Sequence, residues 1–154
     1  MIAGARYVHT NLIARDWRRL ATVYESVFGC VPVPPARDYS GPVFDAGTGI
    51  KGARLTGMHL RMPGPGANNA NGPTLEIFNY SQLADGPASA VNRPGFGHIA
   101  FAVDSVEDAR TEFLAAGGTP VGDVVTLTTD AGARVTWCYL ADPEGNIVEL
   151  QRWD

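Results

Sequence analysis

Two segments of the chain carry the same features in the same order, and this internal repeat constrains the fold more than any other property of the sequence. His9 and His98 each lie in a short apolar run, and a polar turn, an amphipathic stretch and a glycine follow each of them. Gly29 comes twenty residues after His9, and Gly117 comes nineteen residues after His98. A repeat of this kind indicates two copies of one supersecondary unit.

Each copy predicts one amphipathic helix after its first strand. In the first copy Asp16 is a candidate N-cap, and apolar residues then recur at helical spacing until Gly29. In the second copy Ser105 begins a sequence that resembles a capping box, and the helical pattern ends at Gly117. The two helices are therefore expected at equivalent places in the two copies.

After each helix the apolar period changes from 3.6 to 2, with glycine and proline between short runs, which is typical of a meander of strands. The pattern predicts strands near 31–37, 52–62 and 74–80, and again near 120–128, 133–141 and 146–152. Each copy therefore reads as βαβββ. The expected fold is α+β: one domain over 1–154, in which module 1 (about 5–82) and module 2 (about 95–154) form a curved mixed sheet around a central cavity.

The two copies differ in length between their equivalent polar residues. His9 is separated from Glu76 by 67 positions, and His98 is separated from Glu149 by 51. The additional residues of the first copy can lie in the Pro/Gly-rich stretch 32–50 and in the polar stretch 63–73, which we expect to be loops. Loops of this kind often border a ligand site.

The repeat places a histidine in the first strand and a glutamate in the last strand of both copies: His9 and Glu76, then His98 and Glu149. Strand alternation puts each of these side chains opposite the apolar residues that cover the helices. A carboxylate in such a strand is costly unless charge or hydrogen bonds compensate it. Two imidazoles and two carboxylates suit one divalent ion, Ni, Co, Mn, Zn or Fe, with room for water or substrate. His59 finds no counterpart in the second copy and is expected to be a pocket or surface residue.

Charge indicates a small molecule as the partner. The 12 basic and 16 acidic residues give a net charge of −4, and there is no basic run, so nucleic acid and anionic membranes are not expected as partners. Eleven of the basic residues are arginines. Isolated ones such as Arg54, Arg61 or Arg134 have a planar fork that can hold an anionic ligand.

Cysteine usage and hydropathy indicate a cytoplasmic protein. Cys30 and Cys138 are far apart and form no disulfide or thiolate motif. The N-terminal sequence has no secretory pattern, and no segment approaches the roughly 18 apolar residues of a membrane span.

These features together resemble the vicinal oxygen chelate superfamily, which includes glyoxalase I, methylmalonyl-CoA epimerase, extradiol dioxygenases and bleomycin-resistance proteins. The strongest matches are Gly-Phe-Gly-His-Ile-Ala-Phe-Ala-Val-Asp at 95–104 and Asp-Pro-Glu-Gly-Asn-Ile-Val-Glu-Leu at 142–150. Tyr-Glu-Ser-Val-Phe-Gly at 24–29 resembles the end of the family's first helix. The resemblance covers nearly the whole chain.

The resemblance implies a metal-dependent lyase, isomerase or epimerase of the glyoxalase I type. Its members remove a proton next to a carbonyl of a substrate with adjacent oxygens, and a divalent ion stabilises the enediolate or enolate. It further implies Glu149, with Glu76 as its partner, as metal ligand and general base. Members of the family pair their half-sheets within one chain or across a dimer, and we expect a homodimer here.

Departures from individual branches of the family leave the reaction open. Glyoxalase I has an arginine four residues after its first histidine and an asparagine four residues after its first glutamate, where this chain has Ile13 and Tyr80. Arg15 and Asn79 lie nearby but out of phase, so a substrate other than a glutathione adduct is expected. For an epimerase the second proton-transfer acid is missing, because 26–75 contains no glutamate; Asp38 and Asp45 are the only substitutes.

Two alternatives to the lyase or isomerase remain. An extradiol-type dioxygenase holds iron with two histidines and one glutamate, an arrangement that Glu76 would crowd. A metal-free antibiotic-binding protein traps its ligand between aromatic side chains. The aromatic residues available for such a cleft are Phe44, Phe78, Trp137 and Tyr139.

Overall fold

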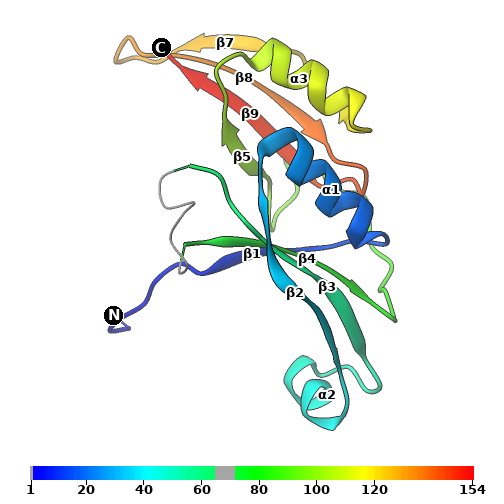
Figure 1. The fold of residues 1–154 in the computed structure, drawn as a ribbon. Helices are drawn as coiled ribbons and strands as arrows, with labels where there is room; N and C mark the ends of the chain where they lie inside the picture. Colours follow the sequence, from blue (N-terminus) through cyan, green and yellow to red (C-terminus); the bar gives the residue numbers. More distant parts are fainter. Residues whose placement is uncertain (1, 65–71) are drawn as a thin grey trace. The chain divides into compact units, whose positions relative to one another are not determined.

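The computed structural model describes residues 2–64 and 72–154, which fall into two compact units, Met1–Asp85 and Gly86–Asp154 (Figure 1). Each unit contains one helix-covered mixed sheet and one copy of the repeat. The α+β class with two tandem βαβββ modules is therefore confirmed, and the expected module boundaries lie inside the two units. The single domain over 1–154 stays a prediction.

The first unit has a four-stranded sheet in the order β1-β4-β3-β2. The strand β1 runs parallel to β4, and the other neighbouring strands are antiparallel. Its elements are β1 (His9–Ile13), α1 (Trp17–Phe28), β2 (Val31–Ser40), α2 (Pro42–Thr48), β3 (Arg54–Arg61) and β4 (Thr74–Tyr80).

The second unit repeats this topology. Its sheet has the order β5-β9-β8-β6, with β7 also paired to β8, and β5 runs parallel to β9. Its elements are β5 (Ile99–Ala102), α3 (Val106–Ala115), β6 (Thr119–Pro120), β7 (Val125–Thr128), β8 (Arg134–Ala141) and β9 (Ile147–Trp153).

Both predicted helix starts are confirmed by their caps. The Asp16 carboxylate accepts a hydrogen bond from the Arg19 backbone N–H at 3.1 Å, and the Ser105 hydroxyl accepts one from the Asp108 N–H at 3.2 Å. Such caps each contribute about 1 kcal/mol. Helix α1 ends at Gly29, whose φ of 67° is a left-handed conformation that glycine adopts without strain.

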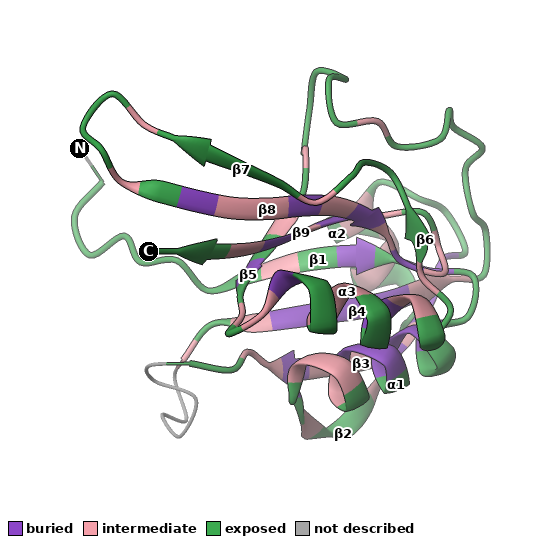
Figure 2. Ribbon diagram, turned by 90° about the horizontal axis from the view of Figure 1, so that it is seen from above, coloured by how far each residue is buried: buried purple, intermediate pink, exposed green. Residues whose placement is uncertain are grey.

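In each unit the helix covers one face of the sheet. Helix α1 packs on β3 and β4, and α3 packs on β8 and β9. Leu75 and Ile77 on β4, and Val148 and Leu150 on β9, have no exposed surface. The alternation of buried and less buried residues along β8 can be followed in Figure 2. The helix-free face of each sheet therefore carries the alternate residues, among them Glu76 and Glu149.

Two predictions about the connecting segments need correction. The stretch 32–50 is not a loop, because β2 continues to Ser40 and α2 occupies Pro42–Thr48 with proline in its first turn and Gly49 as its left-handed C-cap. The single strand expected at 120–128 is two strands, β6 and β7. Most of the loop predicted at 63–73 lies outside the described residues.

Cys30 and Cys138 are buried free thiols. Among the described residues, no helix has the length and apolar character needed to cross a membrane.

Candidate functional site

The first unit brings His9 and Glu76 into contact. Because β1 and β4 are parallel, Asn11 lies beside Glu76 and His9 lies beside Thr74, on the same face as Glu76. The His9 Nδ1 atom is 3.2 Å from Glu76 Oε1. Glu76 is one of the few buried charged residues, with 8% of its surface exposed.

The second unit brings His98 and Glu149 together in the same way. His98 immediately precedes β5, where Ile99 pairs with Val148, so His98 is level with the residue two positions before Glu149. The His98 Nε2 atom is 3.1 Å from Glu149 Oε2. The two His–Glu pairs therefore occupy equivalent positions in the two modules, as the repeat predicts.

Each carboxylate has a second partner on the neighbouring antiparallel strand, which the sequence analysis missed. His59 on β3 lies opposite Glu76, and its Nε2 atom is 3.3 Å from Glu76 Oε1. Tyr139 on β8 lies opposite Glu149 and donates a hydrogen bond to it. Tyr139 therefore takes the position of His59 in the second module, which has no histidine there, and His59 itself lines a pocket, as predicted.

Burial and neighbouring charges shift the pKa values of both His59 and Tyr139. Burial lowers the pKa of His59 below its usual value; Glu76 opposes this effect, while the neighbouring Arg37 and His9 add to it. Burial also raises the pKa of Tyr139, and the hydrogen bond to Glu149 and the charge of that carboxylate raise it further. Tyr139 therefore stays protonated at neutral pH and can donate to Glu149.

Aromatic rings adjoin both supporting residues. The His59 ring lies 5.5 Å from the ring of Phe78, and the His98 ring lies 5.2 Å from that of Tyr139. Phe78 passes over Gly57, where a β-carbon would lie only 2.3 Å from the Phe78 ring. Of the aromatic residues considered for a cleft, Phe78 and Tyr139 thus lie beside candidate site residues.

The spacing within each His–Glu pair fits a shared divalent ion. Two ligand atoms about 2.1 Å from an octahedral ion and at right angles to each other are about 3.0 Å apart. The separations of 3.2 Å and 3.1 Å are close to this value. Among the described residues, no group of three or more His, Cys, Asp or Glu side chains is arranged to hold a metal ion. Each module brings one histidine and one glutamate of the predicted set into contact.

A pocket of about 230 Å³ adjoins His59 in the first unit. It extends from the segment before β1 across to β2, and two of its lining residues are arginines, Arg6 and Arg61. Arg61 lies on β3 two residues after His59 and opposite Thr74. The remaining lining residues are Tyr7, Val8, Val33, Gly72 and Thr74.

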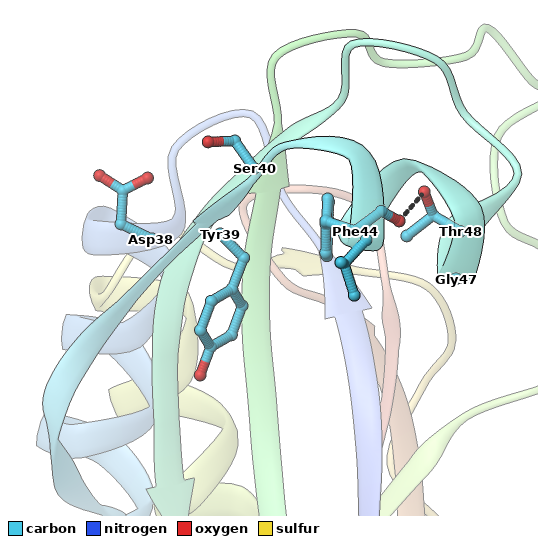
Figure 3. A pocket seen from close by; sticks show the side chains of 7 residues that line it. Asp38, Tyr39, Ser40, Phe44, Gly47 and Thr48 are labelled. Atoms are coloured by element: carbon cyan, nitrogen blue, oxygen red, sulfur yellow. Dashed lines mark hydrogen bonds between the residues drawn. The ribbon is translucent and has the colours of Figure 1, made fainter.

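A larger pocket of about 570 Å³ lies beside α2 at the end of β2 (Figure 3). Phe44 stacks on Tyr80 with ring centroids 6.1 Å apart, and Tyr39 is 6.3 Å from Phe44. Tyr80 is four residues from Glu76, about 13 Å along a strand. This pocket therefore offers aromatic contacts at a distance from the His–Glu pair. It is lined by Asp38, Tyr39, Ser40, Val43, Phe44, Gly47 and Thr48.

Asp38, Asp45 and Asn79 were considered as replacements for residues that other members of the family carry, and each has a partner in the structure. The Asp38 carboxylate binds the Arg54 guanidinium through two contacts of 2.8 and 2.6 Å. Asp45 accepts hydrogen bonds from the backbone of the segment before β3, and the Asn79 amide donates to the Ala14 carbonyl at 2.9 Å. Each of these side chains is thus engaged in a contact of its own, which leaves the His–Glu pairs as the candidate chemical groups.

Comparison with known proteins agrees with this architecture. Residues 6–150 match the model of the family described as the Glyoxalase/Bleomycin resistance protein/Dioxygenase superfamily. A glyoxalase family protein from Bacillus cereus aligns with a TM-score of 0.80 at 16% identity, covering 99% of both chains. A glyoxalase I variant from Zea mays aligns with a TM-score of 0.62 at 16% identity, over 94% of this chain and 45% of that chain. No match is found among curated proteins.

Proposed function

Because the chain belongs to the Glyoxalase/Bleomycin resistance protein/Dioxygenase superfamily, we propose that it is a divalent-metal-dependent lyase, isomerase or epimerase of the glyoxalase I type. Its substrate is a small molecule with adjacent oxygens and an acidic carbon next to a carbonyl. The proposed ligands of the ion are His9, Glu76, His98 and Glu149, contributed by one chain or by a chain and its twofold mate.

The observation that carries this proposal is the duplicated His–Glu contact. The same two residue types meet at the same register positions in both modules, at 3.2 Å and 3.1 Å. A carboxylate that is largely removed from water beside an imidazole is costly to retain without a compensating charge. Glu76 is buried and Glu149 is half-buried, so a histidine contact to such a carboxylate in both copies of the repeat supports a common role in binding one cation.

The chemistry needs a proton acceptor and a way to stabilise negative charge on the substrate. When bound, the ion supplies positive charge next to the substrate oxygens. Glu149, with Glu76 as its partner, is the proposed base that receives the proton from the carbon. Tyr139 and His59 contact these two carboxylates from the neighbouring strands, which keeps each proposed base oriented.

The test is metal analysis combined with hydrogen exchange. Purified protein should contain stoichiometric divalent metal, and Glu149→Gln and His98→Ala should lose it. Glu107→Gln, a matched change at an exposed position of α3, should keep it. The protein should also catalyse deuterium exchange beside a carbonyl in a panel of hydroxy-ketones, hemithioacetals and acyl thioesters. Full metal content in both site variants would remove these residues from the ligand set.

A metal-free binding protein is the second candidate, favoured by the aromatic pocket beside α2. Phe44, stacked on Tyr80 and near Tyr39, offers flat apolar surface for a ring-containing ligand. This candidate predicts tight capture of such a ligand by metal-free protein without turnover, and loss of capture in Phe44→Ala. Metal-dependent exchange in the first experiment would argue against it.

We also propose that the protein is a homodimer, the assembly expected from the family's paired half-sheets. Size-exclusion chromatography with light scattering tests this proposal. A monomer that persists at high protein concentration would contradict the dimer without affecting the ligand assignment.

A further inference from the structure

We infer that the pocket between Arg6, Arg61 and His59 binds an anionic group of the substrate, a carboxylate or a phosphate. This inference rests on the proposed function, because it concerns a second chemical group of the substrate that reacts beside Glu76. It assigns a binding role to Arg61, which the sequence analysis singled out only as one of several isolated arginines.

The lining of the pocket suits an anion. Arg6 and Arg61 each contribute a planar guanidinium, and Tyr7 and Thr74 each contribute a hydroxyl. Asp and Glu are absent from the described residues that line it. Arginine binds carboxylate and phosphate through two parallel hydrogen bonds, which are stronger than bonds between neutral groups. The pocket thus pairs positive charge with additional donors in a volume of about 230 Å³, enough for a small anionic group.

Arg54, on the same strand as Arg61, offers a matched comparison. Its guanidinium binds the Asp38 carboxylate at 2.6 Å. Arg54 is not among the described residues that line the pocket.

The position of the pocket limits the substrate's size. Arg61 follows His59 by two residues on β3, and His59 contacts Glu76. Two residues along a strand span about 7 Å. An anion held by Arg61 and a carbon that reacts beside Glu76 would therefore belong to one small molecule, with only a few bonds between the anionic group and the carbonyl.

Calorimetric titration of metal-free protein with succinate, and separately with inorganic phosphate, tests the inference. At least one of the two should bind, and the one that binds more tightly identifies the anion as carboxylate or phosphate. Arg61→Gln should weaken that binding about tenfold or more, as expected for loss of a charge-assisted pair. Arg54→Gln, which removes the same charge from the same strand, should change it less than about twofold.

A second variant tests the pocket in case Arg61→Gln does not fold. Arg6→Gln lies in the segment before β1, outside the sheet, and should also weaken binding. Absence of binding for both anions, or equal effects of Arg61→Gln and Arg54→Gln, would overturn the inference.

Metal content separates this inference from the proposed function. Arg61→Gln should retain the metal content of the wild type, because arginine supplies no ligand to the ion. Arg61-dependent anion binding in a protein that takes up no metal would support the anion pocket and contradict the metal enzyme. Stoichiometric metal with no anion binding would support the metal enzyme and contradict the anion pocket.

Discussion

Tyr139 lies directly opposite Glu149 across β8 and β9 and donates a hydrogen bond to its carboxylate. His59 lies opposite Glu76 across β3 and β4 in the same way, with its Nε2 atom 3.3 Å from Glu76 Oε1. Each candidate metal-binding carboxylate is therefore contacted from two sides, by a histidine in or next to the parallel strand and by a side chain of the antiparallel strand. Partners of this kind commonly fix the orientation of metal ligands.

Replacing Tyr139 by phenylalanine tests whether this support matters for turnover. Tyr139→Phe removes only the hydroxyl, so the strand pairing should survive and metal content should stay near that of the wild type. Turnover should fall about tenfold, because a hydrogen bond to a charged group contributes about 1.5–3 kcal/mol. Tyr39→Phe, at an exposed position of β2, is the control. Equal rates in both variants would show that the Tyr139 hydroxyl has no role.

His9 and His59 contact the same oxygen of Glu76, and metal analysis can separate their roles. His9→Ala should lose the metal, because it removes a proposed ligand. His59→Ala removes a supporting partner and should weaken metal affinity by about tenfold to a hundredfold while leaving the ion detectable at high metal concentration. Identical metal loss in the two variants would make His59 a ligand as well.

The sequence predicted those parts of the site that depend on local pattern. The caps at Asp16 and Ser105 mark both helices, and alternation of apolar residues places Glu76 and Glu149 on the face away from them. Because the repeat aligns the first and last strands of both modules, it also predicts that His9 meets Glu76 and His98 meets Glu149.

Partners across antiparallel strands were harder to predict, because they depend on the connection between the strands. The short turn 142–146 brings Ala141 opposite Ile147, and counting back from it places Tyr139 opposite Glu149. The sequence therefore held a signal for Tyr139. A longer connection, 62–73, separates β3 from β4, and its length alone does not fix a register. His59 could not be assigned to Glu76 from the sequence for this reason.

The helix α2 was missed because its local signals are weak. Pro42–Thr48 contains only seven residues, one of them glycine, and has no side-chain N-cap. Proline and glycine at its two ends are helix boundary signals, but the same residues are typical of loops. Contacts such as the stacking of Phe44 on Tyr80 are long-range and are not visible in the local sequence.

The buried thiol of Cys30 predicts a loss of stability at alkaline pH. Burial, with a smaller effect of Glu25, raises its pKa from 9.0 to about 12. Between these values the unfolded chain releases the proton and the folded chain keeps it, so the free energy of unfolding should fall as pH rises. The decrease in stability between about pH 8 and about pH 11, measured by urea unfolding, should be smaller in Cys30→Ala than in wild type.

Cys138→Ala is the comparison for this measurement, because it leaves Cys30 in place. Burial also raises the pKa of Cys138. Both thiols should therefore resist a thiol reagent in the native protein near neutral pH and react in denaturant, since the thiolate is the reactive form. Rapid reaction of Cys30 in the native protein would contradict the burial described here.

Gly57 on β3 allows Phe78 to pass over the strand next to His59, and an added methyl group should disturb this arrangement. A β-carbon at Gly57 would lie 2.2 Å from the Ile77 carbonyl oxygen and 2.3 Å from the Phe78 ring. The backbone oxygen is held in the sheet, so the clash cannot be relieved by rotating one side chain. Gly57→Ala should therefore lower the free energy of unfolding by about 2 kcal/mol, as other overpacked sites do.

The same substitution should also affect the site, because the Phe78 ring lies 5.5 Å from that of His59. Displacing Phe78 shifts the neighbouring imidazole, so the NMR signals of His59 should move while those of His98, in the other unit, stay in place. Gly122→Ala is the matched control: its added β-carbon meets no described atom within 4 Å, and its stability should change by less than about 0.5 kcal/mol. If Gly57→Ala were as stable as Gly122→Ala and left His59 unmoved, the close packing of Phe78 over Gly57 would be wrong, and with it the account of how the His59 contact to Glu76 is positioned.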